Sequence, residues 1–295
     1  MIPILDRVKT GDILVSDGAM GSLLFQKGLK IGKCPESLNL TRPELLGEVA
    51  QAYLDAGADI IQSNTFGASP IKLAEYGLDD KTEEINKAAV SIVRKVVADK
   101  AYIYGSCGPS GKILKPFGEV EPEAIYDGFV RQLTAIISEN IDIICVETMT
   151  DLNEAKLALK AVKNISPSTP VMVTMTFQAT PNGFYTIMGN SIRDTVSVLE
   201  DEGAEIVGSN CGNGLEIMIE IAKEFKRNTK LPLIIQANAG LPFYENGNLT
   251  YPETPEFFAQ KTSELIDTGV SIIGGCCGTI PETIQEIRRV VDSRK

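Results

Sequence analysis

The chain has 295 residues, with 28 basic residues against 39 acidic ones, no histidine and a formal net charge of −11. Hydrophobic residues make up 43% of the chain and charged residues 23%; this composition is typical of a globular protein with a large core and excludes a disordered chain. The acidic balance, without a Lys/Arg cluster, argues against a nucleic-acid partner, and no apolar run of about eighteen residues predicts a membrane span.

The N-terminal segment MIPILDRVKTGDILVSDGAM carries charges where a secretory signal would need an apolar core. We therefore expect a cytoplasmic protein, in which the six cysteines are reduced. In that compartment, clustered cysteines indicate metal binding or catalysis rather than a disulfide framework. Cys34, Cys107 and Cys145 stand alone in the sequence, and we expect them to be buried core residues.

From residue 12 onward, short apolar strands alternate with longer stretches of helical period, in eight successive pairs. The predicted strands cover residues 12–17, 58–64, 101–107, 141–147, 170–177, 204–210, 231–238 and 270–275. Helical patterns lie between them, for example over 42–58, 254–269 and 280–295. Several of these begin near a proline and end at a glycine, as helices often do.

Eight strand and helix units in this length predict one closed (β/α)₈ TIM barrel of the α/β class, which spans 1–295 without an internal domain boundary. An open doubly wound sheet would have about five or six strands and a phosphate fingerprint. The segment GAMGS (18–22) follows the first strand but lacks the G-x-G-x-x-G spacing. The closed barrel is therefore the better prediction.

Four segments of the sequence echo one another at the junction between a helix and the next strand. They are LDAGADIIQSN, SENIDIICVE, EDEGAEIVGSN and IDTGVSIIGG. Internal repetition of this kind indicates repeated βα units, and repeated βα units imply a parallel sheet.

Polar and reactive residues gather where the predicted strands end, which is where a barrel of this type carries its active site. They are Asp17 at the end of the first strand, Ser63, Asn64, Thr65 and Phe66 at the end of the second, Glu147 at the end of the fourth, Asn210 and Cys211 at the end of the sixth, Asn238 at the end of the seventh, and Cys276 with Cys277 at the end of the eighth.

Three of these residues, Cys211, Cys276 and Cys277, predict a zinc site. The sixth and eighth strands of a barrel have one strand between them, so their tips can converge. Three thiolates match a tetrahedral zinc with one open position, which is typical of a catalytic site, and the chain has no histidine to fill the fourth position. Gly274, Gly275 and Gly278 are expected to permit the sharp bend that turns both adjacent cysteines toward one metal. The alternative is three buried cysteines that only fill the core.

A zinc held by three thiolates is a mild Lewis acid, which can lower the pKa of an incoming thiol and hold it as a nucleophilic thiolate. Asp17 and Glu147 at neighbouring strand ends are candidates to hold an ammonium group, and the backbone amides of 18–22 and 63–67 to bind a carboxylate. Together these features describe an amino-acid thiol. The alternatives are that Asp17 is a turn residue and that Glu147 makes a structural ion pair.

The motifs DGAMGS (17–22), ADIIQSNTFG (58–67), VETM (146–149), GSNCGNG (208–214), NAGLP (238–242) and GGCCGT (274–279) together resemble the zinc-dependent homocysteine S-methyltransferase family over essentially the whole chain. This resemblance implies a (β/α)₈ barrel with one Zn²⁺ on Cys211, Cys276 and Cys277, and methylation of homocysteine to methionine. It further implies that Asp17 and Glu147 hold the amino group of homocysteine. The amides near Gly18, Ala19 and Thr65 correspond to those around its carboxylate, and Asn238 to a resting metal ligand.

The methyl donor varies in this family among betaine, S-methylmethionine and methylcobalamin. Residues 108–129 and the NAGLP segment are most similar to the homocysteine module of cobalamin-dependent methionine synthase, which continues into further domains. The resemblance thus favours a methyl-corrinoid protein or domain as partner. The chain is then an excised module or a free-standing subunit, and the alternatives are a small donor taken directly or another thiol acceptor.

Two hypotheses of other classes remain at this point. A non-catalytic barrel subunit that senses zinc or redox state would hold a saturated or buried metal. A metal-free hydrolase would use Asp17 and Glu147 as paired carboxylates, but this reading leaves the three cysteines unexplained.

Overall fold

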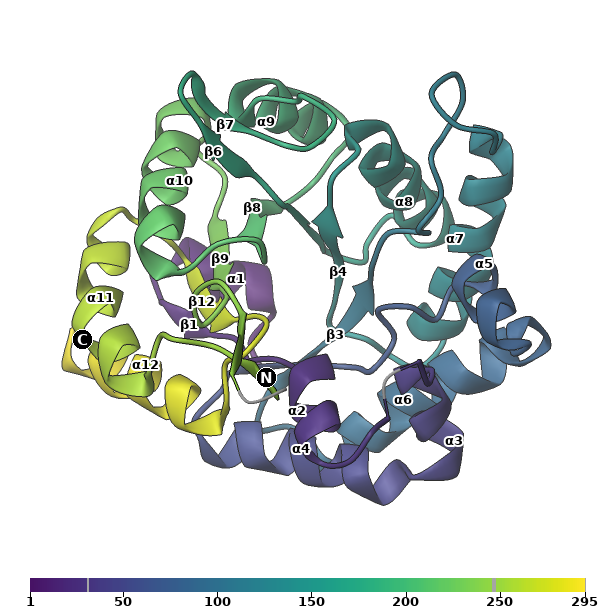
Figure 1. The fold of residues 1–295 in the computed structure, drawn as a ribbon, viewed down its shortest axis with the longest axis horizontal. Helices are drawn as coiled ribbons and strands as arrows, with labels where there is room; N and C mark the ends of the chain where they lie inside the picture. The colour runs from purple at the N-terminus through teal and green to yellow at the C-terminus, as the bar shows by residue number, and fades with distance from the viewer. Residues whose placement is uncertain (31, 246–247, 295) are drawn as a thin grey trace.

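The computed structural model of the protein describes residues 1–30, 32–245 and 248–294 (Figure 1). Eight parallel strands form its central sheet, and each lies within one of the eight predicted strands or extends it by two residues. They are β1 (Leu14–Val15), β2 (Ile60–Gln62), β3 (Tyr102–Cys107), β4 (Ile143–Met149), β5 (Val171–Met175), β8 (Ile206–Asn210), β9 (Leu233–Ala237) and β12 (Ile272–Gly275). The predicted barrel is confirmed.

The strands lie side by side in chain order, and β12 pairs with β1. The ring closes through a parallel bridge between Ser16 and Ile60, supported by a hydrogen bond of 3.0 Å from Asp17 N to Ile60 O. Every strand therefore directs its carboxyl end to the same mouth, as the repeated βα units imply.

An outer ring of helices covers the sheet, one long helix after each strand (Figure 1). These are α4 (Pro43–Asp55), α6 (Thr82–Val97), α7 (Pro122–Ile137), α8 (Leu152–Ile165), α9 (Ile192–Asp201), α10 (Leu215–Asn228), α11 (Pro255–Asp267) and α12 (Pro281–Ser293). Prolines begin α4, α7, α11 and α12, as the sequence predicts. Within the described ranges, no helix is long and apolar enough to cross a membrane.

Shorter helical segments fill the connections that follow the first two strands. They are α2 (Gly21–Gln26), η1 (Pro35–Ser37) and α3 (Leu38–Thr41) after β1, and α5 (Pro70–Leu73), η2 (Ala74–Tyr76) and η3 (Asp79–Lys81) after β2.

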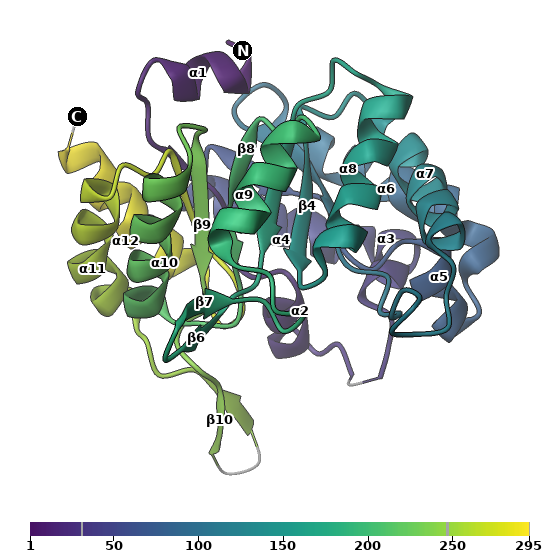
Figure 2. The same ribbon diagram turned by 90° about the horizontal axis from the view of Figure 1, so that it is seen from above.

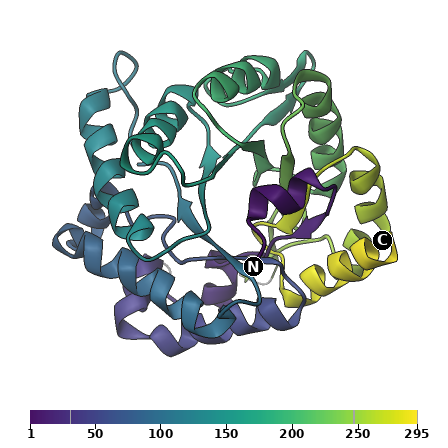
Figure 3. The same cartoon turned by 180° about the vertical axis from the view of Figure 1, so that it is seen from behind.

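The barrel has two apolar layers, one between the sheet and the helices and one inside the sheet. The inner layer includes Cys145, and the other two isolated cysteines are also buried, so their predicted core role is confirmed. A short N-terminal helix, α1 (Ile4–Lys9), closes the end of the barrel opposite the mouth (Figure 3). Ile4 and Val8 of α1 pack against the inner layer.

Contacts at the end of the barrel that α1 closes explain why the four segments of the sequence resemble one another. In three of the four echoed segments an acid directly precedes the strand, and its carboxylate accepts a hydrogen bond of 2.8–2.9 Å from a backbone N–H of the preceding strand. The pairs are Asp59 with Val15, Asp142 with Ile103 and Glu205 with Val171.

Each of these acids is also ion-paired to a basic side chain from the surrounding helices. The pairs are Asp59 with Arg288, Asp142 with Arg94, and Glu205 with Lys163. In the fourth segment the same place is taken by Ser271, whose N–H donates to Leu233 O at 2.9 Å.

Two antiparallel hairpins that the sequence analysis did not predict stand at the mouth of the barrel, on the side away from α1 (Figure 2). One joins β6 (Gln178–Thr180) to β7 (Gly183–Tyr185), and the other includes β10 (Phe243–Glu245) and β11 (Asn248–Thr250). Both follow a barrel strand, so they extend the rim around the strand ends.

Candidate functional site

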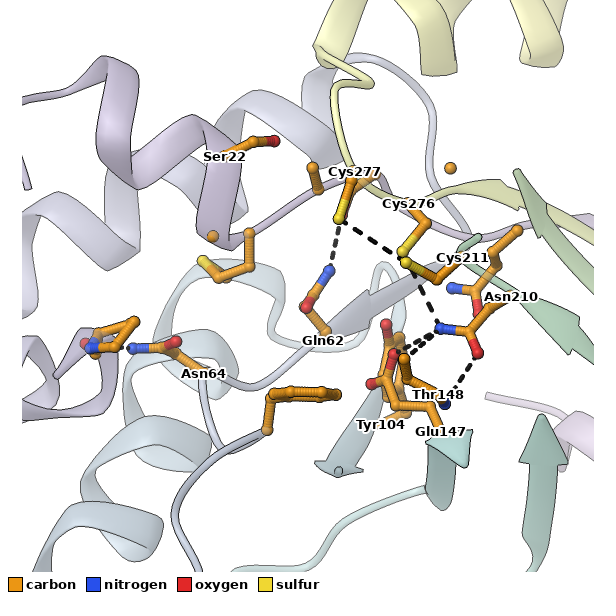
Figure 4. Close-up of a pocket in the computed structure, with 18 of the residues that line it drawn as sticks. Ser22, Gln62, Asn64, Tyr104, Glu147, Thr148, Asn210, Cys211, Cys276 and Cys277 are labelled. Carbon is orange, nitrogen blue, oxygen red and sulfur yellow. Dashed lines mark hydrogen bonds between the residues drawn. The ribbon is translucent and has the colours of Figure 1, made fainter. Parts of the chain in front are cut away.

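A pocket of about 210 Å³ opens at the mouth of the barrel, where the strand ends converge (Figure 4). Its lining comes from the connections after β1 and β2, from Gln62 of β2 and Tyr104 of β3, and from the ends of β4, β8, β9 and β12. It is formed by Gly18, Ala19, Met20, Gly21, Ser22, Pro35, Glu36, Gln62, Ser63, Asn64, Phe66, Tyr104, Glu147, Thr148, Asn210, Cys211, Gln236, Gly275, Cys276 and Cys277. Neither Lys nor Arg is among these lining residues, so the charge that this wall carries is negative.

The three predicted zinc ligands meet at one side of this pocket (Figure 4). The sulfur atoms of Cys211, Cys276 and Cys277 all lie within 4.8 Å of one another, and Cys211 Sγ is 3.9 Å from Cys277 Sγ. A tetrahedral zinc with bonds of about 2.3 Å holds two sulfurs about 3.8 Å apart. The spacing therefore fits a shared metal ion and is far longer than a disulfide bond of about 2 Å.

Strand β9, which lies between β8 and β12, holds both cysteine loops in place. Cys211 N donates to Gln236 O at 3.1 Å, and Cys276 N donates to Ala237 O at 2.7 Å. Cys277 O in turn accepts from Ala239 N at 2.9 Å. The two loops are thus fixed to one common strand, which explains how cysteines far apart in the sequence converge.

The backbone around the cysteines differs in part from the expected bend. Gly278 has a φ of +82° and the ring of Tyr251 covers its Cα, so a side chain has no room there. Gly275 belongs to β12 and does not have a positive φ; a Cβ there would lie 2.2 Å from Thr279 Oγ1. Gly275 is therefore needed for close packing and not for a bend. Cys211 itself has an unusual backbone conformation, with a φ of +60°.

The charges of the cysteine cluster also suit a cation. Hydrogen bonds from Cys276 and Cys277 lower the pKa of Cys211 to about 3. Hydrogen bonds to Cys211 and Cys277 raise the pKa of Cys276, and the hydrogen bond to Cys211 together with burial raises the pKa of Cys277 to about 12. The protein alone thus stabilises one thiolate in the cluster, and a second or third needs a positive charge beside it.

Asp17, at the end of β1, is fully buried behind the pocket and is not part of its lining. Its Oδ2 accepts a hydrogen bond of 2.9 Å from the backbone N–H of Gln62. Burial raises the pKa of Asp17 to about 7, because a buried carboxylate loses the solvation that water gives its charge.

Glu147, in β4, lines the pocket and is nearly buried. Its Oε1 accepts a hydrogen bond from Ser106 Oγ, and its Oε2 accepts one of 3.3 Å from Asn210 Nδ2. Burial raises the pKa of Glu147 to about 7, and the nearby Cys211 acts in the same direction. No cationic side chain contacts it among the described residues, so the structural ion pair considered as its alternative role has no partner here.

We expect Asp17→Asn to increase the stability of the ligand-free protein at pH 8 but not at pH 4.5. The folded pKa lies above the unfolded one, so the folded state binds the extra proton and loses stability as pH rises from about 4 to 7. The gain for the asparagine variant at pH 8 is at most roughly 4 kcal/mol. Urea unfolding at both pH values measures it, with exposed Asp12→Asn as control; an equal change at both pH values would contradict the assignment.

The two loops predicted to bind a carboxylate both lie at the pocket, but some of their backbone N–H groups already donate hydrogen bonds within the protein. Ser63, Asn64 and Phe66 line the pocket, as do Gly18 and Ala19. The N–H of Ala19 donates to Thr279 Oγ1 at 3.1 Å, and the N–H of Thr65 donates to Ser63 O at 2.8 Å. A carboxylate at these two amides would have to share or displace these hydrogen bonds.

Asn238, predicted as a resting metal ligand, is buried beside the cysteines outside the pocket lining. Its side chain contributes a hydrogen bond that lowers the pKa of Cys211, while its Oδ1 is buried without a hydrogen-bond partner among the described residues. An unpaired buried amide oxygen on a side chain that contacts Cys211 is consistent with a place for a cation.

Several residues at the site were missed or given no role by sequence reasoning. Asn210 was placed at a strand end without a function, yet it contacts Glu147, Thr148 and Cys276 (Figure 4). Gln62, the last residue of β2, points toward Cys277 (Figure 4); it lies inside the predicted strand 58–64, where the sequence analysis assigned it no role. Glu36 comes from the long connection after β1, where no periodic signal identifies it, and it accepts a hydrogen bond from Gly67 N.

Comparison with known proteins gives one family match and a consistent set of relatives. The family model described as homocysteine S-methyltransferase matches residues 14–291. The chain is 31% identical over 300 residues to methionine synthase from Mycobacterium tuberculosis, and 30% identical over 296 residues to that from Mycobacterium leprae. These alignments cover 96% and 95% of the chain but 25% and 24% of the relatives, so it spans about a quarter of their length.

A solved structure shares the fold. The homocysteine methyltransferase MmuM from Escherichia coli, in its metallated form, superposes with a TM-score of 0.82 at 22% identity, over 97% of this chain and 99% of that one. At this level of identity, the match supports the barrel architecture.

Proposed function

Because the chain belongs to the homocysteine S-methyltransferase family, we propose that it methylates the thiol of homocysteine to give methionine, with zinc as its resident metal and a methyl-corrinoid protein as its methyl donor. The observation that carries this proposal is the convergence of three cysteine sulfurs within 4.8 Å at the wall of a pocket.

Cys211, Cys276 and Cys277 would hold the metal, with the buried Oδ1 of Asn238 as the resting fourth ligand. Zinc bound there would supply a Lewis acid that lowers the pKa of the substrate thiol. The proton of the thiol passes to solvent water, and the thiolate sulfur attacks the methyl carbon. The new S–CH₃ bond forms as the bond from methyl to donor breaks, and that electron pair stays on the donor. No general base from the chain is required.

The acidic side chains at the pocket would hold the other end of homocysteine. Glu147 faces the pocket with both carboxylate oxygens already supported by hydrogen bonds, which fixes its orientation. An ammonium group beside it would stabilise the charged carboxylate, which burial alone disfavours. Asp17, buried behind the pocket wall, would help to hold the same ammonium group. The loops at 18–19 and 63–66 would bind the carboxylate of the substrate.

The surface around the mouth supports a protein-borne donor. Most of the large exposed apolar side chains belong to loops that follow barrel strands, on the face away from α1 (Figure 2). We call them the mouth apolar set: Phe25, Phe66, Ile113, Phe117, Ile187, Met188, Leu241, Phe243, Tyr244 and Leu249. Exposed apolar side chains concentrated on one face of a protein are consistent with a docking surface. The methionine synthases that align with this chain are about four times as long, which leaves room in them for such a partner domain.

We expect the double variant Phe117→Ser/Tyr244→Ser to impair transfer from a protein-bound methyl-corrinoid. The two side chains are 80% and 78% exposed on different loops of the mouth. The KM for the corrinoid protein should rise by roughly tenfold or more, since a few apolar anchors dominate most interfaces. Transfer from free methylcobalamin should be unaffected. Ile2→Ser, at the opposite end of the barrel, is the control; equal effects with both donors would contradict a docking role.

We place this activity in the cytoplasm, because three neighbouring thiols must remain reduced to bind a metal. The decisive experiment measures zinc content and X-ray absorption at the zinc edge, with L-homocysteine and with L-homoserine, in which oxygen replaces sulfur. Three sulfurs that become four with homocysteine alone support the proposal. An unchanged shell would favour a metal-sensing subunit, and a protein without zinc would favour metal-free chemistry.

A further inference from the structure

Asn210, the last residue of β8, lies between the two ends of the proposed substrate site and is fully buried. Its Nδ2 donates to Glu147 Oε2 at 3.3 Å and lies 4.0 Å from Cys276 Sγ (Figure 4). One short amide side chain therefore touches both the carboxylate proposed for the ammonium group and a sulfur proposed for the metal.

The orientation of this amide is determined by its other contacts. Asn210 Oδ1 accepts from the backbone N–H of Thr148 and from Thr174 Oγ1, both at 2.8 Å. A backbone N–H can only donate, so the amide oxygen must face Thr148 N. The amide NH₂ is consequently directed toward Thr148 Oγ1, Glu147 and Cys276.

The backbone beside Glu147 is strained where Asn210 holds it. Thr148 has a φ of +59°, an unusual conformation for a β-branched residue, and the pairing of β4 with β5 shifts register between Val146 and Met149. Asn210 bonds both the N–H and the hydroxyl of Thr148. Strain of this kind persists only where the surroundings stabilise it, and it is common where a side chain must be aimed.

We infer that Asn210 is a positioning residue that fixes the separation between the Glu147 carboxylate and the Cys276 sulfur, and thereby selects a thiol amino acid by the length of its side chain. The inference rests on the proposed function, in which Glu147 holds the ammonium end and the cysteine cluster the sulfur end. A thiol amino acid with one methylene fewer, cysteine, cannot satisfy both ends while this separation is fixed. Once Asn210 no longer holds Glu147 Oε2, only the hydrogen bond from Ser106 Oγ to Oε1 remains, and the carboxylate can turn about it toward a shorter ligand.

The test compares the dissociation constants of L-homocysteine and L-cysteine for zinc-loaded wild type and Asn210→Ser, by calorimetry. One methylene in a fixed site discriminates by about 10- to 200-fold. We expect the preference for homocysteine to fall at least tenfold in the variant, through weaker homocysteine binding, while zinc stoichiometry stays at the wild-type value. Ser209→Ala is the matched control, because Ser209 precedes Asn210 in the same strand and its hydroxyl has no hydrogen-bond partner among the described residues.

Thr174→Val is a milder second variant, which removes one of the two hydrogen bonds that orient the amide. It should lower the preference in the same direction by a smaller factor, and it decides the matter if Asn210→Ser fails to fold. An unchanged preference in the folded variants, or loss of zinc from Asn210→Ser, overturns the inference. If the wild type binds no homocysteine, the proposed function fails and the inference with it.

Discussion

Cys211→Ser should lose its metal and its methyl transfer while the barrel stays folded. The serine oxygen fits the same backbone, including the φ of +60°, but it is a poor substitute for a thiolate as a zinc ligand. Since even partners of metal ligands change affinity by about 10- to 100-fold, loss of a ligand should weaken zinc binding by more than about 100-fold. Zinc content after dialysis and the rate of methionine formation measure the two effects.

The fold should tolerate this change because Cys211 is on a loop at the mouth, and both core layers lie below it. Circular dichroism should show unchanged helix content. Cys145→Ala is the control of the same residue type: it removes a thiol inside the barrel and should retain the full zinc content. Loss of helical signal in Cys211→Ser alone would mean that the metal is structural.

Glu147→Gln should weaken homocysteine binding and leave zinc content unchanged. The substitution removes the negative charge that would hold the ammonium group, and its NH₂ must face one of two donors, Ser106 Oγ or Asn210 Nδ2. A hydrogen bond to a charged group contributes about 1.5–3 kcal/mol, so the dissociation constant of homocysteine should rise roughly 10- to 150-fold. Calorimetry on the zinc-loaded variant measures it.

Glu154→Gln is the matched control for this prediction. Glu154 is another buried acid, at the start of α8, but its Oε1 accepts from Ser110 N and it does not line the pocket. We expect it to bind homocysteine as the wild type does. If Glu147→Gln lost its zinc instead, the role of Glu147 would be to support the metal rather than to bind the substrate.

The sequence predicted the barrel because short apolar runs, typical of strands, alternate regularly with longer segments of helical period. It also predicted the convergence of Cys211 with Cys276 and Cys277, since chain order alone sets which strands of a closed barrel are near neighbours. Residue type then indicated the metal, because three sulfurs at one point have few other uses.

Contacts that depend on geometry between distant loops were not predictable in this way. The hairpin of β6 and β7 lies within a connection whose short strands carry no strong alternation. The role of Asn210 depends on the positive φ of Thr148 and on a register shift in β4, neither of which leaves a pattern in the sequence. Glu36 reaches the pocket from a connection of 3₁₀ and short helical turns, whose path only tertiary packing defines.

The acids at the closed end of the barrel have a consequence for the accuracy of the mouth. Asp59, Asp142 and Glu205 each accept a hydrogen bond from a backbone N–H of the adjacent strand. These hydrogen bonds fix the register between neighbouring strands. A slip of one residue would turn every side chain of a strand to the opposite face. The strands fixed in this way are β2, β4 and β8, which carry Gln62, Glu147 and Asn210 into the pocket. The accuracy with which the pocket side chains are placed at the mouth thus depends on how the strands are aligned at the closed end of the barrel.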